Sequence, residues 1–141
     1  MTNDNSFYEF NIPIRQFVTK RLVGIDKNST IQEAAKKMDD LNVGSLVVLE
    51  NKKIVGFFTV GDIMSKVVAK GKKSDIPVEK IMIKSLITTD INSSVRDALE
   101  IMAKNDIKHL LIKKNEEIIG ILTYKDLMDI DRHNLETFIS R

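Results

Sequence analysis

The sequence predicts a mixed α/β (α+β) fold, in which two pseudo-twofold-related β-α-β-β-α repeats pack through their sheets. Residues 12–64 align with residues 76–128 without a gap, and the only two prolines, Pro13 and Pro77, fall at equivalent positions. Within each copy, short apolar runs typical of strands alternate with stretches of helical periodicity. A single copy of about 50 residues has too few strands to bury a core alone. Two copies are therefore expected to share one core.

The first half of each copy predicts a strand followed by a helix. A short extended segment, RLVGI at 21–25 or SLITT at 85–89, precedes a polar turn. The helix is expected to begin with a capping box, because Thr30 and Ser94 each precede an acidic residue by three positions. Apolar residues at helical spacing continue it, namely Ile31, Ala34, Ala35, Met38 and Leu41, and Val95, Ala98, Leu99 and Met102.

The second half of each copy predicts a hairpin and another helix. Two apolar runs, at 45–50 and 53–59 and again at 109–114 and 117–123, are joined by a polar link that suits a hairpin. A helix is expected directly after each hairpin. The methionines in the apolar stripes are expected in the core; they are Met38, Met64, Met82, Met102 and Met128.

The repeat also predicts the domain organisation. Residues 12–66 form the first repeat, 67–75 a lysine-rich linker, 76–130 the second repeat and 131–141 a helical tail. We expect a homodimer, the commonest symmetric assembly. The apolar residues outside the repeats that could seal its interface are Phe7, Tyr8, Phe10, Leu135, Phe138 and Ile139.

Composition excludes several function classes. The chain has no cysteine, which removes disulfides, thiolate metal sites and cysteine nucleophiles. A net charge of +2 is too small to argue for a nucleic-acid or membrane surface. The sequence begins without a signal-peptide pattern and has no apolar run long enough for a membrane span, so we expect a cytoplasmic protein. No catalytic set of residues is evident, and we expect that the chain is not an enzyme.

The motif Gly-x-x-Thr-x-x-Asp closes each hairpin, as GFFTVGDIM at 56–64 and GILTYKDLM at 120–128. One interpretation is purely structural: the threonine caps the following helix and the aspartate favours its dipole. The other is functional, because a helix N-terminus offers free N–H groups to an anion such as phosphate. A carboxylate in that first turn can also accept hydrogen bonds from ribose hydroxyls. Both interpretations stay open at this point.

The stretches VGSLVVLENKKIVGFFTVGDIM and IKHLLIKKNEEIIGILTYKDLM resemble the cystathionine-β-synthase (CBS) domain, here in tandem as a Bateman module. The resemblance covers residues 12–130. It implies two clefts between the repeats that bind an adenosine-containing ligand, such as AMP, ADP, ATP or S-adenosylmethionine, with the aspartate on the ribose. The first site would comprise Thr59, Asp62, Gly44, Ser45, Ile87 and Thr88. The second would comprise Thr123, Asp126, Lys108, His109, Lys125, Val23 and Gly24.

The two implied sites differ in charge. Lys108, His109 and Lys125 are cations suited to phosphate, whereas the first site carries little charge. We therefore expect phosphate at the second site. Gly24 stands where the other repeat has Thr88, and this departure is expected to weaken adenine contacts in the second site.

The resemblance implies a regulatory module that senses an adenosine-containing ligand, requires no cofactor and acts on an unidentified effector protein. One alternative is a protein-interaction scaffold whose clefts are vestigial. Another is a nucleic-acid-binding regulator that uses Lys70, Lys72, Lys73 and the basic ends of the chain.

Overall fold

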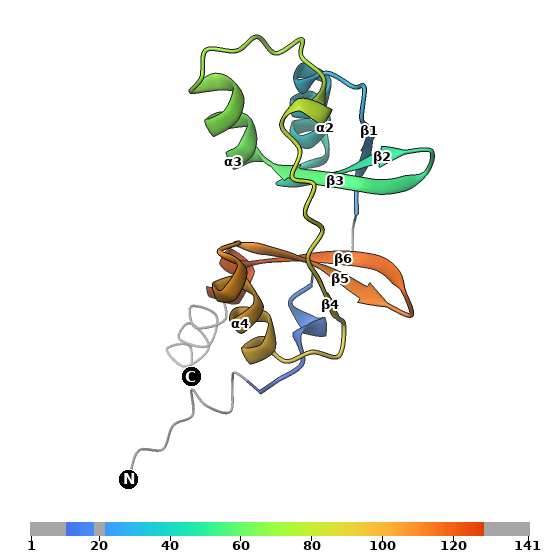
Figure 1. The fold of residues 1–141 in the computed structure, drawn as a ribbon, viewed down its shortest axis with the longest axis vertical. Helices are drawn as coiled ribbons and strands as arrows, with labels where there is room; N and C mark the ends of the chain where they lie inside the picture. The colour runs from blue at the N-terminus through green and yellow to red at the C-terminus, as the bar shows by residue number, and fades with distance from the viewer. Residues whose placement is uncertain (1–10, 19–21, 129–141) are drawn as a thin grey trace. The chain divides into compact units, whose positions relative to one another are not determined.

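The computed structural model describes residues 11–18 and 22–128. The chain divides into two compact units, Leu22–Leu86 and Met1–Arg21 with Ile87–Arg141, which are coloured in chain order in Figure 1. Each unit contains one three-stranded sheet with helices, so the predicted α/β fold with two repeats is confirmed. The expected tail at 131–141 and the apolar residues expected to seal a dimer lie outside the described residues.

The unit Leu22–Leu86 follows the predicted order of elements. These are β1 (Gly24–Asp26), α2 (Ile31–Leu41), β2 (Ser45–Glu50), β3 (Lys53–Thr59), α3 (Val60–Ile63), the π-helix η2 (Met64–Val68) and the 3₁₀-helix η3 (Val78–Lys80). Strand β1 pairs in parallel with β2, and β2 pairs antiparallel with β3. The parallel pair requires a crossover, which α2 supplies. Figure 1 shows α2 and α3 on one face of this sheet.

The second unit repeats this topology. Its elements are η1 (Ile14–Gln16), β4 (Thr88–Asp90), α4 (Val95–Asn105), β5 (His109–Lys114), β6 (Glu117–Thr123) and a helical segment over 124–128. Strand β4 pairs in parallel with β5, and β5 pairs antiparallel with β6, in registers equivalent to those of the first sheet. Extended segments were expected at 21–25 and 85–89. Strand forms only at β1 and β4, because only these residues pair with a neighbouring strand.

The segment that begins each sequence repeat, here called its arm, pairs with residues of the other repeat. Pro13, at the start of the first repeat, forms a β-bridge with Ser94, whereas Pro77 forms the equivalent bridge with Thr30. The Ile14 N–H donates to the Ser93 carbonyl at 2.9 Å. Each arm therefore belongs to the compact unit built mainly from the other copy. The sequence repeats and the compact units differ in this respect.

Each unit has its own cluster of buried apolar side chains. In Leu22–Leu86 the cluster includes Ile31, Ala34, Met38, Leu46, Val48, Phe58 and Val78. In the other unit the equivalent set includes Val95, Ala98, Met102, Leu110, Ile112 and Leu122, joined by Ile14 and Val18. The helical stripes predicted from the sequence contribute to both clusters, but Ala35 is exposed and the half-buried Leu41 belongs to neither cluster.

Two of the methionines expected in the core are on the surface. Met64 is 63% exposed and Met128 is 41% exposed. Val67, on the same helix, is 2% exposed and packs in the core cluster. Helical spacing alone does not tell which face of a mostly apolar helix turns inward. The same helix runs through Val68, into the segment 67–75 that was expected as a linker.

The predicted hairpins form with two-residue turns. Asn51 and Lys52 in one turn, and Asn115 and Glu116 in the other, all have positive φ between 50° and 69°. Such turns match the right-handed twist of the flanking strands. A register shift between Val48 and Leu49 marks a bulge in the first hairpin, and the second hairpin has an equivalent shift.

One predicted capping box is complete and the other is half formed. At α4, the Asp97 N–H donates to Ser94 Oγ and the Ser94 N–H donates to the Asp97 carboxylate. At α2, Thr30 Oγ1 accepts the Glu33 N–H at 3.1 Å, but no return bond forms. The first two N–H groups of α2, those of Ile31 and Gln32, donate to the carbonyls of Ile76 and Ser74 at 3.0 and 2.9 Å.

Candidate functional site

The first Thr-x-x-Asp motif lies at the junction of β3 and α3. The Thr59 N–H donates to Asp62 Oδ2 at 2.8 Å, and the Asp62 N–H donates to Thr59 Oγ1 at 3.3 Å. The Thr59 hydroxyl also contacts Oδ2 at 3.2 Å, while the Lys66 ammonium lies 3.2 Å from Oδ1. Both oxygens of the Asp62 carboxylate therefore have partners.

The second motif repeats the capping arrangement at the end of β6. The Thr123 N–H donates to Asp126 Oδ2 at 3.0 Å, and the Asp126 N–H donates to Thr123 Oγ1 at 3.1 Å. Within the described residues, no hydrogen bond or ion pair reaches Asp126 Oδ1. The side chain of Asp126 is only partly exposed. The capping interpretation is confirmed for both motifs, and among residues 11–18 and 22–128 it leaves Asp126 Oδ1 without a partner.

The strand ends bring further expected residues to each motif within its own unit. Ser45 pairs with Thr59 across the β2–β3 ladder, and His109 pairs with Thr123 across the β5–β6 ladder. The first helical N–H after each motif donates to the residue that precedes the neighbouring strand. The Val60 N–H donates to the Gly44 carbonyl at 3.0 Å, and the Tyr124 N–H donates to the Lys108 carbonyl at 2.7 Å.

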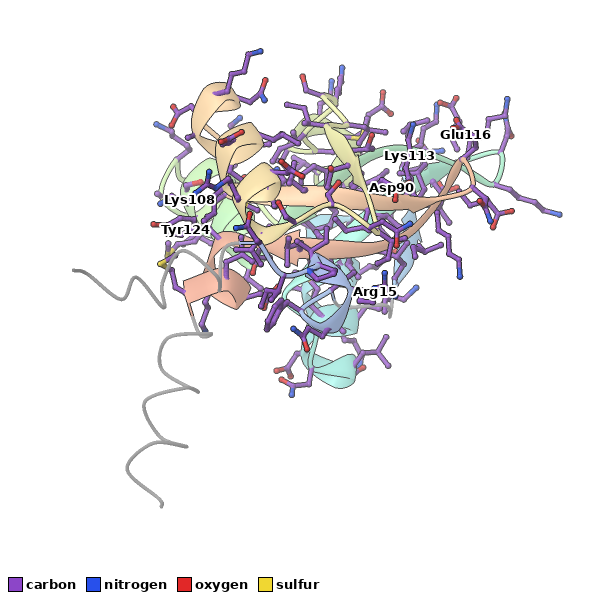
Figure 2. All side chains as sticks on the ribbon, turned by 90° about the horizontal axis from the view of Figure 1, so that it is seen from below. Arg15, Asp90, Lys108, Lys113, Glu116 and Tyr124 are labelled. Atoms are coloured by element: carbon purple, nitrogen blue, oxygen red, sulfur yellow. The ribbon has the colours of Figure 1, made fainter. Side chains whose placement is uncertain are left out.

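The second unit thus gathers cations beside its motif. Figure 2 shows Lys108 next to Tyr124, the first helical residue after β6. The Lys108 and Lys125 side chains are both exposed, and His109 is half-buried. Their equivalents in the other unit, Gly44, Ser45 and Gly61, carry no charge. The arrangement provides positive charge beside the exposed start of a helix, where an anion is favoured.

The expected residues from the other repeat belong to the other compact unit in each case. Ile87 and Thr88, expected with Thr59, are part of the unit that contains β4, and Val23 and Gly24, expected with Thr123, are part of Leu22–Leu86. The structure therefore assembles, in each unit, the portion of the expected site that the motif and the neighbouring strand provide.

A side chain at Gly24 would require the neighbouring Leu49 side chain to shift. A Cβ at this position would lie 2.7 Å from Leu49 Cδ1. In the other repeat, Thr88 is tolerated where the residue equivalent to Leu49 is Lys113. In addition, the Lys37 ammonium donates to the Gly24 carbonyl, so a cation lies beside this residue. The sequence did not indicate Lys37 as a neighbour.

Shallow apolar grooves adjoin both motifs. One of about 320 Å³ lies between α2 and α3 and is lined by residues that include Met38, Val43 and Val60. The equivalent groove of about 180 Å³ is lined by residues that include Met102, Lys108 and Tyr124. Sequence analysis missed both grooves, because they depend on how two helices pack over a sheet.

Sequence analysis also missed Lys66 as the partner of Asp62. The signal was present, since an acidic residue four positions before a lysine on a helix is a favourable pair. In the part of the chain that the structure describes, no three histidine, aspartate or glutamate side chains gather into a group that could hold a metal ion. No described helix has the length and apolar character needed to cross a membrane.

Known proteins resemble the chain over most of its length. An uncharacterized 17.7 kDa protein of Acidianus ambivalens is 37% identical over 127 residues, which cover 87% of this chain and 76% of the relative. The crystal structure of an uncharacterized conserved protein from Pyrococcus horikoshii is 41% identical, with a TM-score of 0.79, over 87% of this chain and 94% of that one. The CBS domain pair of protein MJ0100, solved in complex with 5′-methylthioadenosine and S-adenosyl-L-methionine, is 26% identical with a TM-score of 0.71. This match covers 84% of this chain and 98% of that one.

The family model of the CBS domain matches the chain twice, at residues 14–69 and 78–133. Each match contains one β-α-β-β-α set and one Thr-x-x-Asp motif. The chain therefore belongs to the CBS domain family, as a tandem pair of CBS domains.

Proposed function

We propose that the chain is a cytoplasmic regulatory module that binds an adenosine-containing ligand, AMP, ADP, ATP or an S-adenosylmethionine-like compound, and modulates a partner protein. The ligand would bias the module between two arrangements with different affinity for that partner. Support comes from the family membership and from the MJ0100 domain pair, which was solved with two adenosine-containing ligands.

The observation that carries this proposal is the carboxylate of Asp126. Its Oδ2 is held by the Thr123 N–H, which orients the side chain, while Oδ1 has no partner among the described residues. An oriented carboxylate with one available oxygen suits a ribose hydroxyl, and such charge-assisted hydrogen bonds contribute about 1.5–3 kcal/mol each. The cations Lys108 and Lys125 would favour a phosphate beside it.

Asp126→Asn tests the ribose role against a purely capping role. The substitution keeps the size of the side chain but removes its charge and exchanges one acceptor oxygen for a donor. If Asp126 binds the ribose, affinity for AMP or ATP should fall about 10-fold to more than 100-fold in a calorimetric titration. The matched control is Asp97→Asn. It alters an equivalent capping box, the one that Ser94 and Asp97 form at α4, and leaves the Thr-x-x-Asp motif unchanged.

The two variants should lose similar stability, a few tenths to about 1 kcal/mol, because both weaken one helix cap. Only Asp126→Asn should lose affinity. Equal affinity of both variants would refute the ribose role. If no adenosine compound binds the wild-type chain, the scaffold alternative is favoured, and binding to DNA or RNA that falls steeply with salt would favour the nucleic-acid alternative.

We propose binding without turnover. The one carboxylate in each motif is assigned to the ribose, and among the described residues no group that could hold a metal ion accompanies it. ATP incubated with stoichiometric protein, with and without magnesium, should therefore stay intact. Steady phosphate release that survives repurification would contradict this.

We further propose that the module acts as a homodimer. The second helix of each unit exposes apolar side chains at equivalent positions, which suits an interface between copies; they are Val60, Met64 and Val68, and Tyr124 and Met128. Light scattering should give twice the chain mass of 16.0 kDa, and a mass of one chain across working concentrations would contradict the proposal.

A further inference from the structure

Lys66 makes the two Thr-x-x-Asp motifs chemically unequal. Its ammonium lies 3.2 Å from Asp62 Oδ1 and donates to the Ile81 carbonyl at 3.1 Å. The other carboxylate oxygen of Asp62 already accepts the Thr59 N–H at 2.8 Å. Asp62 Oδ1 is therefore occupied by a cation, whereas Asp126 Oδ1 has no partner in the part of the chain that the structure describes.

Two constraints hold Lys66 in this position. It follows Asp62 by four residues, within the π-helix η2, so the two side chains lie on one helical face. The Ile81 carbonyl, at the end of η3, supplies a second acceptor from a different element. The Asp62 side chain is only 15% exposed, compared with 41% for Lys66. A shielded ion pair with a second hydrogen bond competes with a ligand more strongly than a fully exposed pair would.

The other repeat cannot form the same pair. The alignment of residues 12–64 with 76–128, continued by two positions, places Ile130 opposite Lys66. Isoleucine has no charge and no hydrogen-bond donor in its side chain. The difference is thus encoded in the sequence as one residue, although only the contacts around Asp62 reveal its consequence.

We infer that Lys66 is a specificity-determining residue, which occupies Asp62 Oδ1 and reserves ribose binding for Asp126. The inference rests on the proposed ribose role of the motif. On this basis the chain has one strong adenosine site, and the motif at Asp62 is a latent site that removal of the Lys66 charge opens.

The test uses the full chain with Asp126→Asn, so that only the motif at Asp62 remains. Lys66→Met is added, which keeps a long apolar stem and removes the ammonium. The control is Lys70→Met in the same background, because Lys70 is exposed and has no contact with Asp62 among the described residues. The probe is AMP, titrated by calorimetry or by amide chemical shifts, with 2′,3′-dideoxy-AMP as the analogue that lacks the ribose hydroxyls.

Lys66→Met should strengthen AMP binding about 10-fold or more, because a charged acceptor becomes available to the ribose. The dideoxy analogue should show no gain, and neither should the Lys70 control. An unchanged or weaker affinity for AMP, or an equal gain with the dideoxy analogue, would overturn the inference. Failure of the proposed function is a separate result, since it appears as an unchanged AMP affinity when Asp126→Asn is made in the otherwise wild-type chain.

Circular dichroism should show that each variant folds. If Lys66→Met does not fold, Lys66→Leu replaces it, because leucine also removes the ammonium, offers no donor to Asp62 Oδ1 and favours a helix. The expected gain and the overturning outcomes are the same for this variant.

Discussion

Gly56→Ala should detach the arm of residues 81–83 from the edge of β3. A Cβ on Gly56 would lie 2.6 Å from Met82 Sδ and 3.0 Å from the Ile83 carbonyl oxygen. The methionine side chain can move, but the Ile83 backbone exchanges two hydrogen bonds with Phe57. The Phe57 N–H donates to the Ile83 carbonyl at 3.1 Å, and the Ile83 N–H donates to the Phe57 carbonyl at 2.7 Å. The added methyl group therefore has to displace a paired segment.

The cost follows from these contacts. Forcing one extra carbon into a packed site costs about 1–3 kcal/mol. If the arm lifts instead, two hydrogen bonds are lost at about 1 kcal/mol each. We expect a loss of about 2–3 kcal/mol in the free energy of unfolding, measured by urea denaturation followed by far-UV circular dichroism.

Gly44→Ala is the control, because a Cβ at that position would meet nothing within 4 Å. It should change stability by less than about 0.5 kcal/mol. Met82→Ala combined with Gly56→Ala should lose less than the sum of the two single losses, since it removes the nearer of the two clashes. A Gly56→Ala variant as stable as the Gly44 control would refute the packing of this arm against β3.

Three further predictions concern the helix cap, the core and one surface ion pair. Ser94→Ala should cost about 0.5–2 kcal/mol of unfolding free energy in urea titrations, because it removes the acceptor of the capping box at α4. Phe58→Ala, at a side chain with 0% exposure, should cost about 3–5 kcal/mol, whereas Gln32→Ala, at an exposed position of α2, should stay within about 0.5 kcal/mol. The hydrogen bond to Glu50 raises the pKa of Lys27 above 10.5, so its stabilising contribution is present below pH 10.5 and is lost as the pH rises through the raised value. The difference in Tm between wild type and Lys27→Met should therefore shrink above pH 10.5.

Most of the architecture was predictable because it depends on local patterns that occur twice. Helical spacing identified Ile31, Ala34 and Met38, which are buried, and the acid after Ser94 identified a complete capping box. The same reasoning was wrong for Met64 and Ala35, which are exposed. A periodic pattern defines an apolar stripe, but the face that packs on the sheet depends on the neighbouring elements.

The sequence likewise determined only part of the candidate site. The sequence by itself determined the repeated Thr-x-x-Asp motif, the strand-to-helix junction that it caps and the greater positive charge around Asp126. Only the tertiary structure decided that the arm with Pro77 pairs at Thr30 and that the carbonyl of Ile81 shares Lys66 with Asp62. These contacts join residues that are distant along the chain, and side-chain periodicity carries no information about such partners. Caps and turns are specified by neighbours within a few residues, whereas the occupancy of a carboxylate oxygen depends on which distant backbone folds against it.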